Sequence, residues 1–134
     1  MALTDSNSIL RAYLLTQPVA ALVGNRIYCP RAPEGASVPN ITFFTRGGRS
    51  TPYIPDIASP SKQIDIWADD SVEARTIYRS LYDSLQGIQN VNVVIGVNTY
   101  VILSCREEVH GQDLVDTDIP NRFRVLSFWE IQVR

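Results

Sequence analysis

Cys105 and His110 are the pair of side chains in this 134-residue sequence that best fits nucleophilic catalysis. A cysteine attacks as its thiolate, and a histidine can take up the thiol proton only from within hydrogen-bond reach. The two residues are close in the sequence, but their spacing across the end of a predicted strand does not build a dyad. We interpret Cys105 as a buried thiol and His110 as a loop residue, and keep a small α+β hydrolase as an alternative.

Acidic side chains are concentrated between residues 107 and 118, in a stretch without lysine or arginine. Carboxylate oxygens are ligands for hard cations such as Ca²⁺. The stretch does not have the regular spacing and the glycine of an EF-hand loop, so we predict no metal ion here. We interpret it as an acidic, solvent-exposed loop. Its acidic residues are Glu107, Glu108, Asp113, Asp116 and Asp118.

The sequence RGGR, over residues 46–49, has the glycine content of a phosphate-binding loop. Such a loop requires a helix immediately after it, together with a lysine and a serine or threonine. Here Thr51-Pro52 follows, which favours a flexible turn at the end of a strand. No catalytic, cofactor-binding or metal site is therefore predicted, and the sequence favours a protein that is not an enzyme.

The overall composition is that of one ordinary globular domain, with 45% hydrophobic residues, 19% charged residues and a net charge of −2. This charge gives no electrostatic footprint for nucleic acid or for a membrane surface. Two cysteines make no disulfide framework, which fits a reducing compartment. The N-terminus lacks a signal-peptide pattern, and no apolar run approaches the roughly 18 residues of a membrane helix.

The hydrophobic pattern predicts the elements that must position these side chains. Apolar residues at helical spacing predict an N-terminal helix capped by Asp5 or Ser6, and a longer helix over 71–86 capped by Asp70. Alternating and β-branched stretches predict strands over 26–29, 40–45, 63–68, 91–103 and 123–133. The predicted fold class is α+β, a mainly antiparallel sheet packed against one long and one N-terminal helix, in a single domain over residues 1–134.

A long connection lies between the second and third of these strands. Its sequence, RGGRSTPYIPDIASPSK over residues 46–62, contains three prolines and two glycines. A structureless connection of this length is uncommon in a compact domain, and is usually functional or disordered. We predict an interface loop, with a passive surface loop as the alternative. The expected apolar anchors are Tyr53 and Ile54, and the expected charged rim is Arg46, Arg49 and Lys62.

The last predicted strand, over 123–133, has apolar residues on both faces. This pattern is typical of a central strand covered on both sides, or of a strand whose second face is covered by a neighbouring subunit. We expect Leu126 and Phe128 to lie on that covered second face. Exposed edges of the 91–103 or 123–133 strands are the expected sites of subunit contact, because unpaired edges attract partners.

The order of these features resembles that of the tail terminator proteins of long-tailed bacteriophages, also called tail completion or head–tail joining proteins. Three stretches carry the resemblance, namely LLTQPVAALVGNRIYCPRAPEGASVPNITFF, QIDIWADDSVEARTIYRSLYDSLQG and RVLSFWEIQVR. They are similar to the family's succession of helix, strand and proline-containing loop, to its strand leading into an amphipathic helix, and to its closing strand. All three are patterns of packing rather than of chemistry.

The resemblance implies a virion protein, made in the host cytoplasm, that assembles into a hexameric ring. In that family the ring caps the finished tail tube, stops its elongation and presents a surface to the head connector or stopper protein. DNA passes through the central channel without sequence-specific binding. The implied partners are therefore other copies of the chain, the major tail tube protein, the head protein and DNA, with no cofactor and no membrane. Another neck protein of the same particle is the alternative.

In such a ring the 46–62 loop would gain its order from a partner, and the 107–118 loop has two alternative positions. Acidic loops that face the channel would repel the DNA phosphates. Acidic loops that face the next subunit would pair with its arginines, such as Arg122 or Arg124. The sequence does not distinguish these two arrangements.

Overall fold

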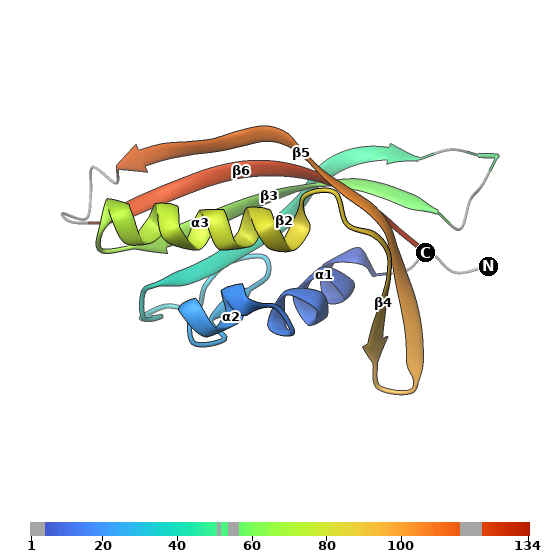
Figure 1. The fold of residues 1–134 in the computed structure, drawn as a ribbon, viewed down its shortest axis with the longest axis horizontal. Helices are drawn as coiled ribbons and strands as arrows, with labels where there is room; N and C mark the ends of the chain where they lie inside the picture. The colour runs from blue at the N-terminus through green and yellow to red at the C-terminus, as the bar shows by residue number, and fades with distance from the viewer. Residues whose placement is uncertain (1–4, 51, 54–56, 116–121) are drawn as a thin grey trace.

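The computed structural model describes residues 5–50, 52–53, 57–115 and 122–134. Within these ranges the chain forms a six-stranded sheet with helices on one of its faces (Figure 1). The helices are α1 (Ser6–Leu15), α2 (Pro18–Leu22) and α3 (Ser71–Leu85). The strands are β1 (Ile27–Tyr28), β2 (Asn40–Ser50), β3 (Ala58–Ala68), β4 (Gln89–Ile95), β5 (Asn98–Val115) and β6 (Phe123–Val133). None of the described helices is long and apolar enough to cross a membrane.

The strand order across the sheet is β1-β2-β3-β6-β5-β4. Neighbouring strands are antiparallel, except that β1 runs parallel to β2. The predicted α+β class is therefore confirmed. The last strand, β6, lies in the interior of the sheet between β3 and β5, but the described helices cover only one of its faces. Both edges of β6 are paired, so the prediction of an exposed edge in 123–133 is wrong.

Both longer helices begin at aspartates, Asp5 as one of the two predicted caps of α1 and Asp70 as the predicted cap of α3. The Asp5 carboxylate accepts hydrogen bonds from the backbone N–H groups of Asn7 and Ser8, at 3.1 and 3.4 Å. The Asp70 carboxylate accepts one from the N–H of Val72 at 3.1 Å. Each cap satisfies donors that have no partner within the first helical turn, which typically contributes about 1 kcal/mol.

The hydrophobic core lies between the helices and the face of the sheet that they cover, which we call the inner face. The predicted apolar stripe of α3 is buried, and consists of Ala74, Ile77, Tyr78, Leu81 and Leu85. Alternate residues of β3 and β6 complete this layer, with Ile64 and Ile66 fully buried and Trp129 1% exposed. Burying each such side chain stabilises the folded chain by about 1.5–3 kcal/mol. This layer therefore holds the inner face of the sheet against the helices, and the opposite face points away from them.

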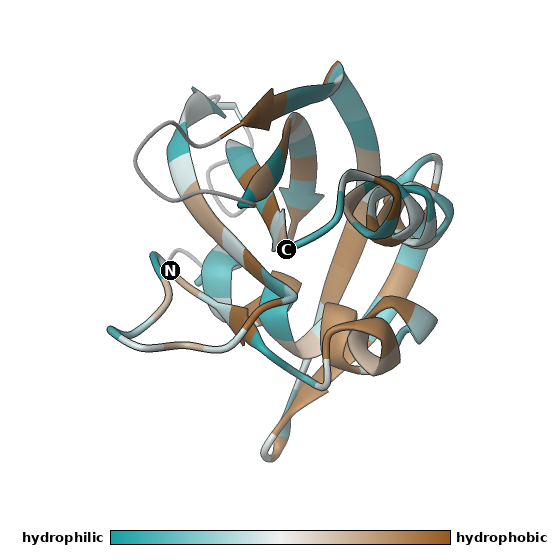
Figure 2. Cartoon of the chain, turned by 90° about the vertical axis from the view of Figure 1, so that its left-hand side faces the viewer, coloured by the Kyte–Doolittle hydropathy of each residue, from teal (hydrophilic) through white to brown (hydrophobic). Residues whose placement is uncertain are grey.

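The prediction of one strand over 91–103 is wrong, because the chain reverses direction within it. β4 and β5 form an antiparallel hairpin, with Ile95 opposite Asn98 and Gly96-Val97 as a two-residue turn. Gly96 has a φ of +61°, as tight hairpin turns require at their first central position. The hairpin projects from the body of the molecule (Figure 1 and Figure 2), so the residues of 91–103 do not line one face of a single strand.

The predicted 46–62 loop is wrong at both of its ends. β2 and β3 extend into it from either side, so that only residues 51–57 connect the two strands. The pairing register shifts after Thr45, which marks a β-bulge. Gly48 has a φ of +126°, and a Cβ atom there would lie 2.5 Å from the carbonyl oxygen of Ser59. This glycine therefore lets two backbones approach closely, rather than loosening the chain.

The predicted acidic loop over 107–118 is wrong in its first part, because β5 extends to Val115. Successive side chains of a strand point to opposite faces of the sheet, so the acidic residues of β5 are divided between the two faces. Asp116 and Asp118 lie outside the described residues.

Candidate interaction surface

The face of the sheet opposite the helices is the candidate functional surface, and we call it the outer face. Among the described elements no helix covers it (Figure 1). It is formed by side chains that alternate with the inner-face residues of β2, β3, β5 and β6. Its central members are Phe44, Arg46, Ser61, Gln63, Arg106, Glu108, Leu126, Phe128 and Glu130.

Arg46 organises the middle of the outer face. Its Nε donates a hydrogen bond to Ser61 Oγ at 2.9 Å, and the Ser61 hydroxyl donates to a carboxylate oxygen of Glu108 at 2.5 Å. The guanidinium carbon of Arg46 lies 4.0 Å from the centre of the Phe128 ring, which is a cation–π contact. The fold thus brings together Arg46, Glu108 and Phe128, which belong to three separate groups in the sequence analysis.

Arg49 lies beside a polar cavity of about 210 Å³ on this face. Two arginines, Arg46 and Arg49, and two glutamates, Glu108 and Glu130, contribute to its lining. Arg106 pairs with Glu130 at 3.0 Å. Because these charges balance, the cavity does not favour anions over cations. Its lining is suited to hydrogen bonds with a polar partner.

Lys62 is not part of a charged rim, contrary to the prediction. It lies on the inner face without exposed surface. Its ammonium group donates to three oxygens, at 2.7 Å from Ser6 Oγ, 2.6 Å from Asn7 Oδ1 and 2.6 Å from Thr45 Oγ1. Burial lowers the pKa of Lys62 from its ordinary value of 10.5 to about 8. The three acceptors match the three donors of the ammonium group, so Lys62 ties β3 to the start of α1.

Leu126 and Phe128 are half-buried on the outer face. Beside them, the guanidinium carbon of Arg124 lies 5.1 Å from the centre of the Trp67 ring, and its Nε lies 3.9 Å from an Asp65 carboxylate oxygen. Arginines of the same chain therefore stack over two aromatic rings of this face. That a neighbouring subunit covers Leu126 and Phe128 stays a prediction.

The two predicted apolar anchors lie in the connection between β2 and β3. Tyr53 is 90% exposed there. Ile54 lies outside the described residues. Their role in contact with a partner stays a prediction.

The acidic residues of β5 do not form one cluster. Glu107 lies on the inner face, where its carboxylate accepts a hydrogen bond from the Tyr78 hydroxyl and contacts Nδ1 of His110 at 2.7 Å. Asp113 lies 3.6 Å from a guanidinium nitrogen of Arg75 on α3. In the part of the chain that the structure describes, no three potential metal-binding side chains come together.

Cys105 and His110 do not form a catalytic pair. Cys105 is 3% exposed, and burial raises the pKa of its thiol to about 12, so the reactive thiolate is scarce at neutral pH. Nδ1 of His110 contacts the Tyr78 hydroxyl at 2.9 Å and the Glu107 carboxylate. The side chain of His110 is therefore held by Tyr78 and Glu107 rather than by the thiol.

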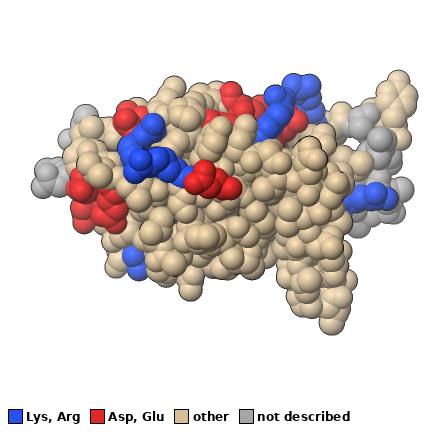
Figure 3. Space-filling model, in the orientation of Figure 1, with Lys and Arg blue, Asp and Glu red and all other residues tan. Residues whose placement is uncertain are grey.

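The exposed β4–β5 hairpin was not predicted from the sequence. Val97 in its turn is 98% exposed, and Val94 is 66% exposed. The space-filling view shows the hairpin as a projection without acidic or basic side chains on the visible face (Figure 3). Residues 84–105 contain no Asp, Glu, Lys, Arg or His. Gly96, between two β-forming runs, is the signal that could have revealed the turn.

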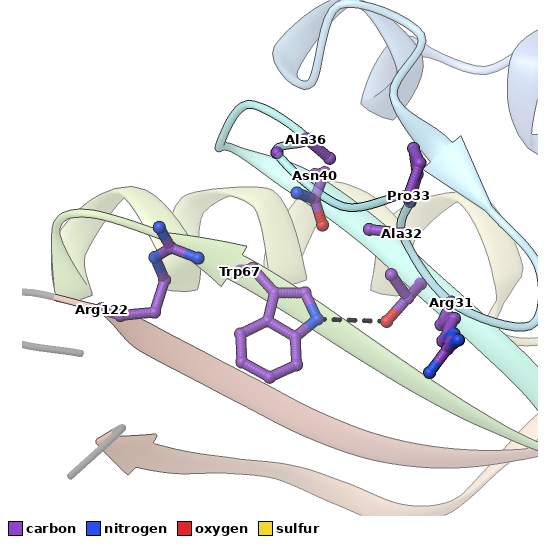
Figure 4. A pocket seen from close by; sticks show the side chains of 9 residues that line it. Arg31, Ala32, Pro33, Ala36, Asn40, Trp67 and Arg122 are labelled. Atoms are coloured by element: carbon purple, nitrogen blue, oxygen red, sulfur yellow. Dashed lines mark hydrogen bonds between the residues drawn. The ribbon is translucent and has the colours of Figure 1, made fainter. Parts of the chain in front are cut away.

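A pocket of about 350 Å³, where β2 begins and β3 ends, was not predicted either. We call it the Trp67 pocket. The loop between β1 and β2 lines it with Ala32, Pro33 and Ala36, next to the Trp67 ring (Figure 4). The indole N–H of Trp67 donates to Thr42 Oγ1 at 3.1 Å, which fixes the ring on the sheet. The sequence carries no signal for this pocket, because its residues come from separate segments.

The fold is similar to that of a chain in a solved structure, the virion of a native gene transfer agent particle. The two chains superpose with a TM-score of 0.60 and 16% sequence identity, over 95% of this chain and 96% of the other. At this identity the likeness shows a shared fold along nearly the whole of both chains. No protein-family model and no curated protein matches the sequence.

Proposed function

We propose that this chain is a non-enzymatic structural protein of a phage-like virion, in which it forms a hexameric ring that caps the tail tube. The ring ends elongation of the tube and provides the surface to which the head attaches. The observation that carries the proposal is the fold shared, from end to end, with a chain of a gene transfer agent virion. The resemblance of the sequence to tail terminator proteins supports it independently of the superposition.

A closed ring requires heterologous contacts, in which one surface of each copy meets a different surface of the next. The sheet has two different edges that suit such contacts. One is β4, and the other is the part of β2 that the short strand β1 leaves unpaired. Since unpaired edges readily accept other chains, the subunit has the surfaces that a ring needs.

We assign contact with the tail tube to the connection between β2 and β3, where Tyr53 is exposed. Two long strands carry this connection away from the core, so it can be changed without disturbing the fold. Replacing residues 51–57 with Asn-Gly, a preferred two-residue hairpin turn, should leave a folded subunit that no longer caps tubes. Normal capping by that variant would contradict this assignment.

The acidic residues have two alternative roles in the ring. They either face the channel and repel DNA phosphates, or face the next copy and pair with arginines such as Arg122 or Arg124. Neutralising Asp113, Asp116 and Asp118 together distinguishes the two roles. Loss of ring assembly would indicate pairing, whereas slower DNA ejection from particles with intact rings would indicate the channel.

Growth of tail tubes in the presence of the chain tests the proposed function. Tube protein that polymerises with the chain is expected to give tubes that stop growing once they are capped. Tubes whose growth rate and length do not change in a molar excess of the chain would contradict the capping role. Binding to the neck of heads, without binding to tubes, would instead identify another neck protein of the same particle.

A further inference from the structure

The β4 edge of the β4–β5 hairpin lacks the charges and prolines that usually protect a sheet edge. Native proteins normally blunt edge strands with charges, prolines or covering elements. β4 is the last strand of the sheet, yet residues 84–105 contain neither a charged residue nor a proline. Val94 and Val97 are exposed, and the hairpin that carries them projects from the body of the molecule (Figure 3). An uncharged, valine-rich projection of this kind is expected to bind another protein surface.

The turn of the hairpin also carries polar groups that lack partners. Gly96 and Val97 take no part in the β4–β5 ladder, and neither has a backbone hydrogen bond within the described chain. A surface that receives this tip must therefore offer an apolar wall and hydrogen-bonding groups at the same time.

The Trp67 pocket offers both. Its apolar wall is the Trp67 ring with the alanines and the proline of the β1–β2 loop. Two polar atoms in its lining residues are buried without a hydrogen-bond partner among the described residues, Asn40 Oδ1 and Arg122 Nε. The amide nitrogen of Asn40 donates to the Ser37 carbonyl at 3.0 Å, and Arg122 Nε lies 3.9 Å from Asp69. The residues that line the pocket thus carry one acceptor and one donor without a hydrogen bond, which are the kinds of group that the N–H and C=O groups of a turn bind.

We propose that the tip of the hairpin, Gly96-Val97, inserts into the Trp67 pocket of a second copy of this chain. Val97 fills the apolar space beside Trp67, and the peptide groups of the turn bind Asn40 and Arg122. The hairpin lies beyond the end of α3, whereas the beginning of β2 and the end of β3, which contribute to the pocket, lie near the start of α3, toward the opposite end of the long axis (Figure 1). Each copy therefore uses its tip toward one neighbour and its pocket toward the other, which is a heterologous contact.

A second copy is favoured as the occupant because every chain carries one tip and one pocket of matching chemistry. The inference deepens the proposed function, since it names a subunit contact of the ring. The contact between two copies does not depend on the proposed function. Only the statement that such contacts close into a ring rests on it.

Val97→Glu tests the tip. Val97 is 98% exposed, so the variant is expected to fold normally, but its carboxylate would lose water on entering an apolar pocket. The dissociation constant for self-association, measured by analytical ultracentrifugation, is expected to rise about tenfold or more. Val72→Glu is the matched control, because Val72 is 67% exposed on α3 outside both surfaces, and it should leave the constant unchanged.

Ala36→Glu tests the pocket and is expected to weaken self-association to a similar extent. Pro33→Glu, at an exposed site in the same loop, replaces it if Ala36→Glu unfolds the chain. In a mixture, Val97→Glu chains keep an intact pocket and Ala36→Glu chains keep an intact tip. Native mass spectrometry is therefore expected to show one-to-one pairs of the two variants but no larger assemblies. A contact between two identical edges predicts no such pairing.

Self-association that Val97→Glu leaves unchanged would overturn the inference, as would folded variants that fail to pair, or a wild-type chain that stays monomeric at about 1 mM. Failure of the proposed function is distinguishable from these outcomes. A chain that associates through this contact but leaves tubes uncapped refutes only the capping role. A chain that caps tubes equally well with Val97→Glu refutes only the inference.

Discussion

The guanidinium carbon of Arg46 lies 4.0 Å from the centre of the Phe128 ring. Arg46 belongs to β2 and Phe128 to β6, and β3 lies between these two strands. The arginine side chain therefore reaches across a strand to cover the ring, and on the way it donates to Ser61 of that strand. Arg46 links three strands of the outer face, so its removal has a measurable consequence.

Arg46→Ala is expected to lower the free energy of unfolding by about 1–2 kcal/mol. The cation–π contact contributes about 0.5–1 kcal/mol at such a site, and the hydrogen bond to Ser61 contributes about as much. Urea unfolding measures the loss. Arg49→Ala, in the same strand, is the control, with an expected change below about 0.5 kcal/mol. Equal losses in the two variants would show that cover of Phe128 adds nothing to stability.

The buried Lys62 makes stability depend on pH. Folding lowers the pKa of Lys62 from 10.5 to about 8, so between these pH values the unfolded chain binds more protons than the folded chain. The cost of burying the charge is fully present below pH 8 and is relieved as the pH rises toward 10.5. This shift corresponds to about 3 kcal/mol of stability gained across the window.

Lys62→Met separates this effect from the cysteines and tyrosines that titrate in the same range. We expect the free energy of unfolding of the wild type, minus that of the variant, to rise by up to about 3 kcal/mol across the window. Urea unfolding of both proteins at a series of pH values measures this difference. A difference that is constant with pH would contradict a lowered pKa for Lys62.

The Tyr78 hydroxyl holds three groups of β5 to α3. It donates to the Glu107 carboxylate, contacts Nδ1 of His110, and accepts a hydrogen bond from the Gly111 N–H at 3.0 Å. Tyr78→Phe is expected to lower the free energy of unfolding by about 1–3 kcal/mol, because buried polar groups lose their partner. Tyr82→Phe is the control, since no hydrogen bond of its hydroxyl occurs in the described structure. Similar losses in both variants, measured by chemical denaturation, would contradict this role.

Gly48→Ala is expected to destabilise the protein more than Gly47→Ala, although both glycines have a strongly positive φ. A Cβ atom at Gly48 would meet the Ser59 carbonyl oxygen at 2.5 Å, whereas one at Gly47 would meet nothing within 4 Å. Gly47→Ala therefore costs only the backbone strain of about 1–3 kcal/mol, and the clash at Gly48 adds about 1 kcal/mol or more. Thermal unfolding of the two variants measures the difference. Equal transition temperatures would show that the bulge relaxes around the new methyl group.

Elements with a complete local pattern were predictable from the sequence. The caps Asp5 and Asp70 and the apolar stripe of α3 are examples, because their signals lie within one or two turns of the helix they form. The β4–β5 turn was not predictable in the same way. Apolar residues alternate without interruption through Gly96-Val97, so periodicity alone does not show that the chain reverses there. The ends of β2 and β3 are polar and rich in glycine and proline, and such strands have no hydrophobic signature.

Some residues of the candidate surface were noted from the sequence, but neither the whole set nor its arrangement was predictable. Arg46, Glu108 and Phe128 meet only because β6 lies between β3 and β5, and nothing in the local sequence specifies that order. Lys62 was expected at the surface because lysine is almost never fully buried without partners. Its partners come from α1 and β2, and their approach is a property of the folded chain.

Electron microscopy of tail tubes mixed with the chain tests the central claim most directly. We expect a ring of density with sixfold symmetry at one end of each tube, absent when the chain is omitted or when residues 51–57 are replaced with Asn-Gly. Tubes with two bare ends in saturating amounts of the folded chain would contradict the claim that this protein closes the tail.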